Sequence, residues 1–323
     1  MPIIHHSSYH RSRLMPNGHF ETIYPALFRK VEAVGYERER IELPDGDFLD
    51  LDWLDGGNRR LLLLTHGLEG STDRHYMQGM ARIFFKNQWD VLAWNCRSCS
   101  GEINRSQRMY HHGEIGDIEE VIRHALRTKD YETVVLTGFS MGGNINMKYL
   151  GVHGRERPEP VRACVAFSSP TDIEAGAYIL DHASNVIYRK RFLRHLKVKM
   201  VKKNEQYPGV LDLRNFRKIR TWRDFDEYFS APLNGFRDAA EFYQQASAKN
   251  FMPGIAVPTL LVQALNDPIL PPECYPKDIC EKHPHIFLEM PKHGGHVGFW
   301  HPGKEFAWSE VRALEFVNSL SEI

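Results

Sequence analysis

The chain has 323 residues, and its 41 lysines and arginines are balanced by 41 aspartates and glutamates. Equal numbers of opposite charges exclude a global field that would draw the protein to nucleic acid, so such a partner would need a local patch. The five cysteines do not form a disulfide framework in a chain of this length, and their odd number leaves at least one free thiol, which fits a reducing compartment.

The start of the chain, Met-Pro-Ile-Ile-His-His-Ser-Ser-Tyr-His, lacks the basic residues and the apolar stretch of a secretion signal. No apolar run approaches the length that crosses a bilayer. We therefore expect a cytoplasmic location, no transmembrane segment and no nucleic-acid partner.

Short β-type runs alternate with longer helical stretches, which predicts a mostly parallel sheet of about eight strands flanked by helices. The runs 36–43 and 48–54 enclose Leu-Pro-Asp-Gly-Asp and predict an antiparallel hairpin at the sheet edge. The other predicted strands are 60–66, 89–95, 133–139, 161–168, 258–264 and 285–290, and the predicted helices are 73–87, 114–128, 141–152 and 304–320.

Residues 171–250 break this alternation, because they are rich in charged and aromatic residues and contain no clear strand. We expect a helical cap or lid here, inserted before the strand 258–264, within a single domain that covers residues 1–323. The basic stretch 188–203 could touch anionic lipid or an acidic partner, but a solvated face of the cap is the preferred interpretation.

The most informative stretch is Val-Val-Leu-Thr-Gly-Phe-Ser-Met-Gly-Gly, residues 134–143, where a predicted strand runs directly into G-x-S-x-G. This order is that of the nucleophile elbow, a sharp strand-to-helix turn that exposes one serine, here Ser140, above the sheet. Neighbours without a Cβ atom permit the close approach of strand and helix that the turn needs. Because the five-residue pattern also occurs by chance, the rest of the chain must support it.

A serine nucleophile needs a histidine base that a carboxylate orients, in the chain order Ser, acid, His. Asp267 follows the carboxyl end of the predicted strand 258–264 and would lie on the same edge of the sheet as Ser140. Two histidines follow the last predicted strand, and we favour His296, which comes after a flexible Gly-Gly pair, over His293. The oxyanion of the reaction needs two N–H donors, for which we expect Met141 and, in the His-Gly-x loop after strand 60–66, Leu68.

Cys96 and Cys99 form a C-x-x-C with His111 and His112 nearby, which raises the question of a metal or redox site. The adjacent histidines point apart, and the other three cysteines form no second pair at usable spacing. We therefore interpret Cys96 and Cys99 as small residues in a loop after a strand, and we expect no metal and no cofactor.

Short motifs along nearly the whole chain carry a specific resemblance: Asn-Gly-His-Phe-Glu-Thr-Ile (17–23), Pro-Ala-Leu-Phe (25–28), His-Gly-Leu-Glu-Gly-Ser (66–71), Arg-Ser-Cys-Ser-Gly-Glu-Ile-Asn (97–104), Tyr-His (110–111), Gly-Phe-Ser-Met-Gly-Gly-Asn (138–144) and Gly-His-Val-Gly-Phe (295–299). With them the chain resembles the α/β-hydrolases, and more narrowly the YheT-like esterases, which are related to the eukaryotic abhydrolase-domain proteins. Carried over by position, the resemblance implies Ser140 as nucleophile, Asp267 as acid, His296 as base, and Leu68 and Met141 as oxyanion donors.

Two positions depart from the pattern of the resembled family. Asn266 stands before the acid, where we expect a second aspartate, and Ser98 stands where the family usually has the glycine of Arg-Gly-Cys. The neutral Asn266 should leave Asp267 with less like-charge repulsion. Neither change touches the proposed triad.

The resemblance implies a carboxylesterase that acts on short- to medium-chain acyl esters, and some relatives transfer acyl groups to alcohols. We expect a serine hydrolase that forms an acyl-enzyme on Ser140 and acts on a small-molecule ester. An acyltransferase with an alcohol or thiol acceptor has the same triad, so the sequence does not separate the two. A hydrolase-fold protein that only binds a ligand or partner is less favoured, because such proteins often lack a triad residue.

Overall fold

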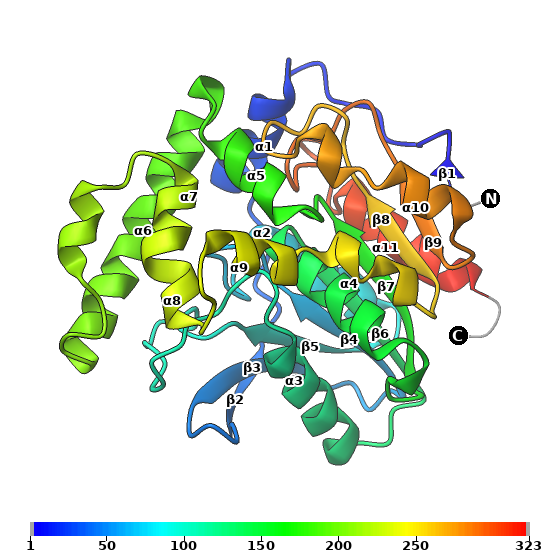
Figure 1. Ribbon diagram of the computed structural model, residues 1–323. Coiled ribbons are helices and arrows are strands. Elements are labelled where there is room, and N and C mark those ends of the chain that lie inside the picture. The colour runs from blue at the N-terminus through cyan, green and yellow to red at the C-terminus, as the bar shows by residue number, and fades with distance from the viewer. Residues whose placement is uncertain (1–2, 321–323) are drawn as a thin grey trace.

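In the computed structural model, which describes residues 3–320, nine strands form one sheet flanked by helices (Figure 1). The strands lie side by side in the order β1-β9-β8-β7-β6-β4-β5-β3-β2. Only β3 pairs in antiparallel fashion, with β2 on one side and β5 on the other, so the sheet is mostly parallel as predicted. Their bounds are β1 Ile3–Ile4, β2 Glu37–Glu42, β3 Phe48–Leu54, β4 Arg60–Thr65, β5 Asp90–Asn95, β6 Thr133–Phe139, β7 Val161–Phe167, β8 Thr259–Val262 and β9 Ile286–Glu289.

The central strands are buried on both faces because helices cover both sides of the sheet. In β4, Leu61 and Leu63 pack into one hydrophobic cluster, while Leu62 and Leu64 pack into another on the opposite face. Successive side chains of a strand point to opposite faces, so an unbroken apolar run is what a strand buried on both sides requires.

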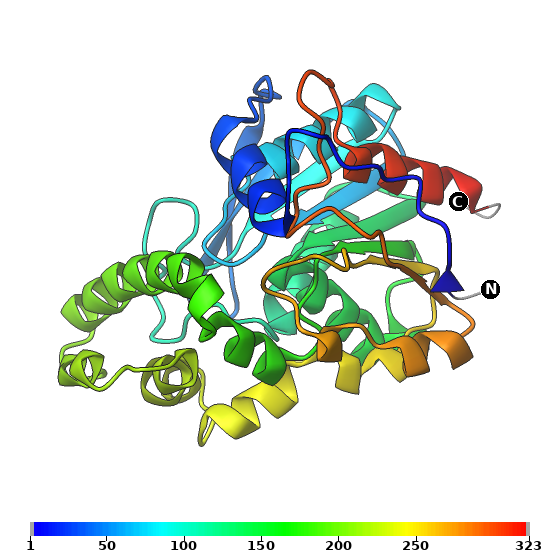
Figure 2. The same ribbon diagram turned by 90° about the horizontal axis from the view of Figure 1, so that it is seen from above.

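Helices α2 and α11 contribute side chains to one of these clusters, and α3 and α4 to the other, so the pairs lie on opposite faces of the sheet (Figure 2). The helices are α1 Gly18–Phe28, α2 His75–Lys86, α3 Ile115–Thr128, α4 Met141–His153, α5 Ile173–Leu180, α6 Val186–Gln206, α7 Trp222–Phe225, α8 Ala231–Leu233, α9 Ala239–Ala246, α10 Lys277–Lys282 and α11 Trp308–Ser319. No helix within residues 3–320 is long and apolar enough to cross a membrane.

The eight predicted strands and the edge hairpin are confirmed, with ends displaced by one or two residues at most positions. The last helix begins at Trp308 rather than at residue 304, because the chain first makes a loop in which Trp308 N–H donates to Phe299 O (2.9 Å). Three elements lie outside the predictions: β1, which has two residues, the short α10, and α1, which holds Pro25 in its interior. A proline within a helix removes a backbone donor and so masks the helical signal.

Between β7 and β8 the chain forms the helices α5 to α9, and α6 is the longest of them, with 21 residues. Figure 1 shows α6 with α7 and α8 standing to one side of the sheet, above the chain segment that joins β5 to α3. The segment predicted as a cap is therefore helical, while its role as a lid and the single-domain boundary 1–323 stay predictions.

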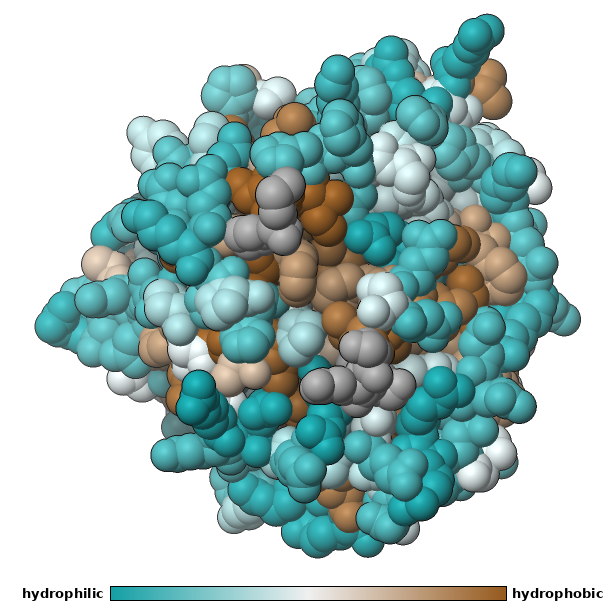
Figure 3. All heavy atoms as spheres, turned by 90° about the vertical axis from the view of Figure 1, so that its right-hand side faces the viewer, coloured by the Kyte–Doolittle hydropathy of each residue, from teal (hydrophilic) through white to brown (hydrophobic). Residues whose placement is uncertain are grey.

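At the other end of the sheet, β1 forms the edge beside β9 and lies near α10. Figure 3 shows this face, where hydrophilic side chains predominate around a central group of apolar ones. An edge strand of only two residues offers few free backbone groups, which limits pairing with another chain.

Candidate active site

Ser140 occupies the sharp turn between β6 and α4, with backbone angles of φ +52° and ψ −120°. This region is unfavourable for a residue with a side chain and costs on the order of 1–3 kcal/mol, so the surroundings must hold it. Ser140 N–H donates to Phe167 O (2.8 Å), and a Cβ atom added to Gly142 would lie 2.2 Å from Thr65 O. Only glycine at position 142 lets α4 approach the end of β4 this closely.

The side chains of Ser140, His296 and Asp267 form one hydrogen-bonded chain. His296 Nδ1 lies 2.8 Å from Asp267 Oδ2, and His296 Nε2 lies 2.9 Å from Ser140 Oγ. An ionised carboxylate can only accept, so Nδ1–H donates to Asp267 and leaves Nε2 to accept the hydrogen of the serine hydroxyl. The Asp267 side chain is fully buried, and Ile269 N–H donates to its other oxygen (2.9 Å).

The structure thus brings together three side chains from distant segments, and they are the three that the sequence predicts as a triad. His293, the alternative base, lines neither cavity at Ser140, and its Nδ1 has no hydrogen-bond partner within residues 3–320. The geometry therefore favours His296 over His293.

Backbone N–H groups of the loop that carries His296 donate hydrogen bonds to side chains of two other segments. His296 N–H donates to Thr22 Oγ1 (2.8 Å), and Thr22 Oγ1–H donates to Gly18 O (2.7 Å) in α1. On the other side, Val297 N–H donates to Ser168 Oγ (2.9 Å), directly after β7. The motif 17–23 carries part of the family resemblance, but no local signal in the sequence shows that Thr22 in α1 meets the His296 loop.

The loop after β4 brings Leu68 close to Ser140. His66 is fully buried, with Nδ1–H donating to Gly67 O (2.7 Å) and Nε2 accepting from Cys96 N–H (3.0 Å). Burial lowers the pKa of His66 to about 4, so this imidazole is neutral near pH 7 and ties the loop to the end of β5. A Cβ atom on Gly67 would come within 3.2 Å of Ser140 Cβ, so a glycine permits the close approach.

The two expected oxyanion donors, the N–H groups of Leu68 and Met141, donate no hydrogen bond within residues 3–320. Met141 is the first residue of α4, where backbone N–H groups have no partner inside the helix. Both groups are therefore available to a substrate oxygen.

Two cavities meet at Ser140 and His296. The smaller has a volume of about 50 Å³ and a mostly apolar wall that includes Leu180, Phe192 and Trp222. The larger, of about 170 Å³, is lined by the loop of residues 67–70 and by polar side chains from α2 and α6. Leu68 and Phe192 belong to both walls, so the reaction centre lies between an apolar cavity and a cavity whose wall also carries charged side chains.

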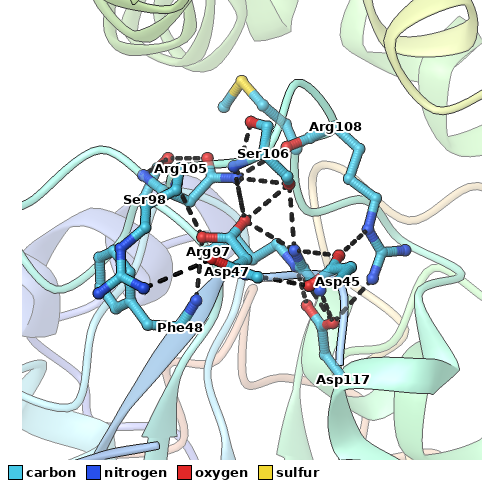
Figure 4. A network of polar contacts seen from close by, with 12 residues as sticks. Asp45, Asp47, Phe48, Arg97, Ser98, Arg105, Ser106, Arg108 and Asp117 are labelled. Carbon is cyan, nitrogen blue, oxygen red and sulfur yellow. Dashed lines mark hydrogen bonds and ion pairs between the residues drawn. The ribbon is translucent and has the colours of Figure 1, made fainter. Parts of the chain in front are cut away.

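A buried polar network supports the segment between β5 and α3, on which α6 rests (Figure 4). The Arg97 guanidinium, with a side chain only 1% exposed, pairs with Asp47 and Asp117 at 2.7 Å each. Burial alone would raise the pKa of Asp47, but hydrogen bonds from Asn104 and Ser106 hold it well below its ordinary value. The network holds in place the loop that contains Asn104 and Ser106, to which α6 is attached.

All five cysteines are free and buried. Cys99 Sγ lies 3.3 Å from Lys199 Nζ, and burial raises the pKa of both Cys96 and Cys99. No group of three or more His, Cys, Asp or Glu side chains in the described part of the chain is arranged to hold a metal ion.

A family profile described as the alpha/beta hydrolase fold matches residues 60–302. YheT of Escherichia coli, named as a candidate esterase, is 35% identical over 317 residues, which cover 95% of this chain and 92% of YheT. A monoacylglycerol lipase of Saccharomyces cerevisiae is 24% identical, with 89% of this chain and 75% of the lipase covered.

Among solved structures, the esterase Pf2001 of Pyrococcus furiosus superposes with a TM-score of 0.57 at 18% identity, covering 88% of this chain and 92% of the esterase. At this identity the likeness shows the shared fold.

Proposed function

Since the chain belongs to the α/β-hydrolase fold family, among relatives of the esterase and lipase type, we propose that it is a serine carboxylic ester hydrolase. The observation that carries the proposal is the hydrogen-bonded chain from Ser140 through His296 to Asp267. Ser140 is the nucleophile, His296 the base and Asp267 the group that orients it.

In the first half of the reaction, His296 Nε2 accepts the hydroxyl proton as Ser140 Oγ attacks the ester carbonyl. Asp267 stabilises the imidazolium that forms, and the N–H groups of Leu68 and Met141 donate to the oxyanion. His296 then returns the proton to the departing alkoxide, which leaves as an alcohol, and an acyl group remains on Ser140.

In the second half, a water molecule loses its proton to His296 Nε2 and attacks the acyl carbonyl, which releases the carboxylic acid and restores Ser140. All proton transfers pass through one imidazole, so the reaction needs no metal and no cofactor.

We propose short- to medium-chain acyl esters as the substrates. The apolar cavity of about 50 Å³ supports the short end of this range. A group of the size of a water molecule needs about 10–15 Å³ of such a cavity. The cavity therefore holds roughly three to five such groups, which fits a short acyl chain. Transfer of the acyl group to an alcohol or thiol uses the same steps, and hydrolysis and ester formation measured across alcohol concentrations separate the two activities.

The proposal is tested with Ser140→Ala, with p-nitrophenyl butyrate as the substrate. We expect kcat to fall by about 10⁴-fold or more, because no other group supplies the nucleophile. A fluorophosphonate probe should label the native protein and leave Ser140→Ala unlabelled.

Ser184→Ala is the control, because the side chain of this exposed serine hydrogen-bonds His182 and lines neither cavity at Ser140. Its turnover and labelling should equal those of the native protein. Wild-type turnover by Ser140→Ala, together with no labelling of the native protein, contradicts the mechanism.

A further inference from the structure

The basic stretch of the sequence lies on α6, and two sets of its cations face different cavities. Lys190, Arg194, Lys197 and Lys202 line a groove that does not include Ser140 or His296. Arg191 and His195 instead line the larger cavity at Ser140, which fits their i, i+4 spacing on one face of the helix.

Arg74 lies on another part of the same cavity wall, directly before α2. Its half-buried guanidinium donates to a backbone carbonyl, Glu69 O (3.0 Å). Neither Arg74 nor Arg191 forms an ion pair with a carboxylate anywhere within residues 3–320. The cavity therefore presents two guanidinium groups that pair with no carboxylate of residues 3–320.

Glu69 is the one acidic side chain on this wall, and its charge is already matched. Its carboxylate lies 2.7 Å from Lys199 Nζ and accepts a hydrogen bond from Tyr110 OH. It is therefore not free to pair with Arg191 across the cavity.

The start of α2 adds to the positive potential. His75 and Tyr76 lie on the cavity wall, and the first turn of α2 has no acidic residue and no side-chain cap. Backbone N–H groups at the start of a helix favour a nearby negative charge. The chain has no net charge, so this local excess of positive groups is a property of the cavity and not of the whole surface.

We propose that the larger cavity binds an anionic group, a phosphate or a carboxylate, on the alcohol half of the ester. The apolar cavity takes the acyl chain, since hydrocarbon gains free energy by burial there. Arg74 and Arg191 then bind the anion, because a guanidinium group matches the oxygens of carboxylates and phosphates with paired N–H donors. This inference rests on the proposed function, because it assigns the two halves of the ester to the two cavities.

The test uses three butyrate esters that share the acyl group: 1-butyrylglycerol, 1-butyrylglycerol 3-phosphate and 4-butyryloxybutanoate. We expect kcat/KM for at least one anionic ester to exceed that for the neutral ester by about tenfold, through a lower KM. Preference for the phosphate ester identifies a phosphate site, and preference for the carboxylate ester identifies a carboxylate site.

Arg74→Gln and Arg191→Gln should each lower the ratio of anionic to neutral kcat/KM by about tenfold. The ratio isolates anion binding from any general loss of activity, which Arg74→Gln can cause through the lost bond to Glu69 O. Arg194→Gln is the matched control, because this exposed arginine lies on the same helix and lines the other groove. Its ratio should equal that of the native protein.

The inference is overturned by a native enzyme that shows no preference for either anionic ester, or by Arg74→Gln and Arg191→Gln variants that keep the native ratio. An equal fall of the ratio in Arg194→Gln also overturns it, because the effect would then belong to the charge of α6 as a whole. These outcomes are distinct from failure of the proposed function, in which Ser140→Ala hydrolyses all three esters at the native rate.

Discussion

Asn266 joins two segments that hold His296 in place. Its Nδ2–H donates to Glu21 Oε2 (2.6 Å) in α1, and its Oδ1 accepts from Gly295 N–H (3.1 Å), next to His296. A side chain in this position must donate on one side and accept on the other, which the asparagine amide does and an ionised aspartate does not. The sequence shows the departure from the expected aspartate, but only the structure shows Glu21 as its partner.

We predict that Asn266→Asp lowers the activity at alkaline pH. Aspartate beside Glu21 forms a pair that shares one proton at low pH, and loss of that proton leaves two repelling carboxylates that displace the His296 loop. Relative to the native enzyme, kcat/KM for p-nitrophenyl butyrate should fall by about tenfold between pH 6 and pH 9, equivalent to about 1.4 kcal/mol.

The double variant Glu21→Gln, Asn266→Asp restores a donor and an acceptor and should recover most of the loss at pH 9. A pH profile of Asn266→Asp parallel to that of the native enzyme contradicts the prediction.

Ser98 shows how a second departure is accommodated. Its φ of +64° lies in the region that favours glycine, which explains why glycine is expected there. Ser98 Oγ–H donates to Asn104 Oδ1 (2.6 Å), and Oγ accepts from Asn104 N–H (3.1 Å). These buried bonds offset a backbone cost of about 1–2 kcal/mol.

At the scale of elements, α6 is attached to the body of the protein by two lysines on its inner side. Lys199 pairs with Glu69 (2.7 Å), and the buried Lys203 donates to Asn104 O (2.6 Å) and Ser106 O (2.7 Å). Glu69 follows Leu68, so the first attachment ties α6 directly to the loop that carries an expected oxyanion donor.

Lys203→Met should lower the free energy of unfolding by about 2 kcal/mol, because two buried carbonyls lose a charged donor while the cost of burying the charge also disappears. Amide hydrogen exchange in α6 should become faster, and exchange in β6 should change less. Lys202→Met, on the exposed side of the same turn, is the control and should change the unfolding free energy by less than about 0.5 kcal/mol. Equal destabilisation by the two variants contradicts the attachment.

At the scale of the whole molecule, burial keeps several histidines neutral. Burial lowers the pKa of His66 and His112 to about 4 and that of His75 to about 3, from an ordinary value of 6.5. The unfolded chain binds these protons below pH 6.5 and the folded protein does not, so stability falls as the pH drops. Burial has the opposite effect on Asp226 and Glu310, raising the pKa of their carboxyl groups to about 7 and about 6, and it also raises the pKa of Asp117. The three histidines, together with carboxylates of lowered pKa such as Asp47, outweigh these three groups.

We therefore predict that the urea midpoint of unfolding is lower at pH 4.5 than at pH 7. His75→Phe should flatten this dependence, because it removes one group that gains a proton on unfolding. His182→Phe, at an exposed position, should leave the slope as it is. A midpoint that is constant or higher at pH 4.5 contradicts the prediction.

The sequence by itself determined the strands of the sheet and the order of Ser140, Asp267 and His296 along it. These features depend on local signals, namely unbroken apolar runs of strand length and reactive side chains that directly follow a strand. In a parallel sheet the carboxyl ends of strands share one edge, so the order of the segments places their side chains near one another. The catalytic roles of these residues, and of Leu68 and Met141, stay predictions that Ser140→Ala begins to test.

Only the tertiary structure decided which residues support the site and which cations face it. Thr22 reaches the His296 loop from 274 positions away along the chain, and Glu21 reaches Asn266 from 245 positions away. Arg191 lines the reaction cavity, whereas Arg194, three residues further along α6, lines another groove. These facts depend on where a helix docks and which of its faces meets the site. Docking is set by packing against distant elements, and a local residue pattern does not encode it.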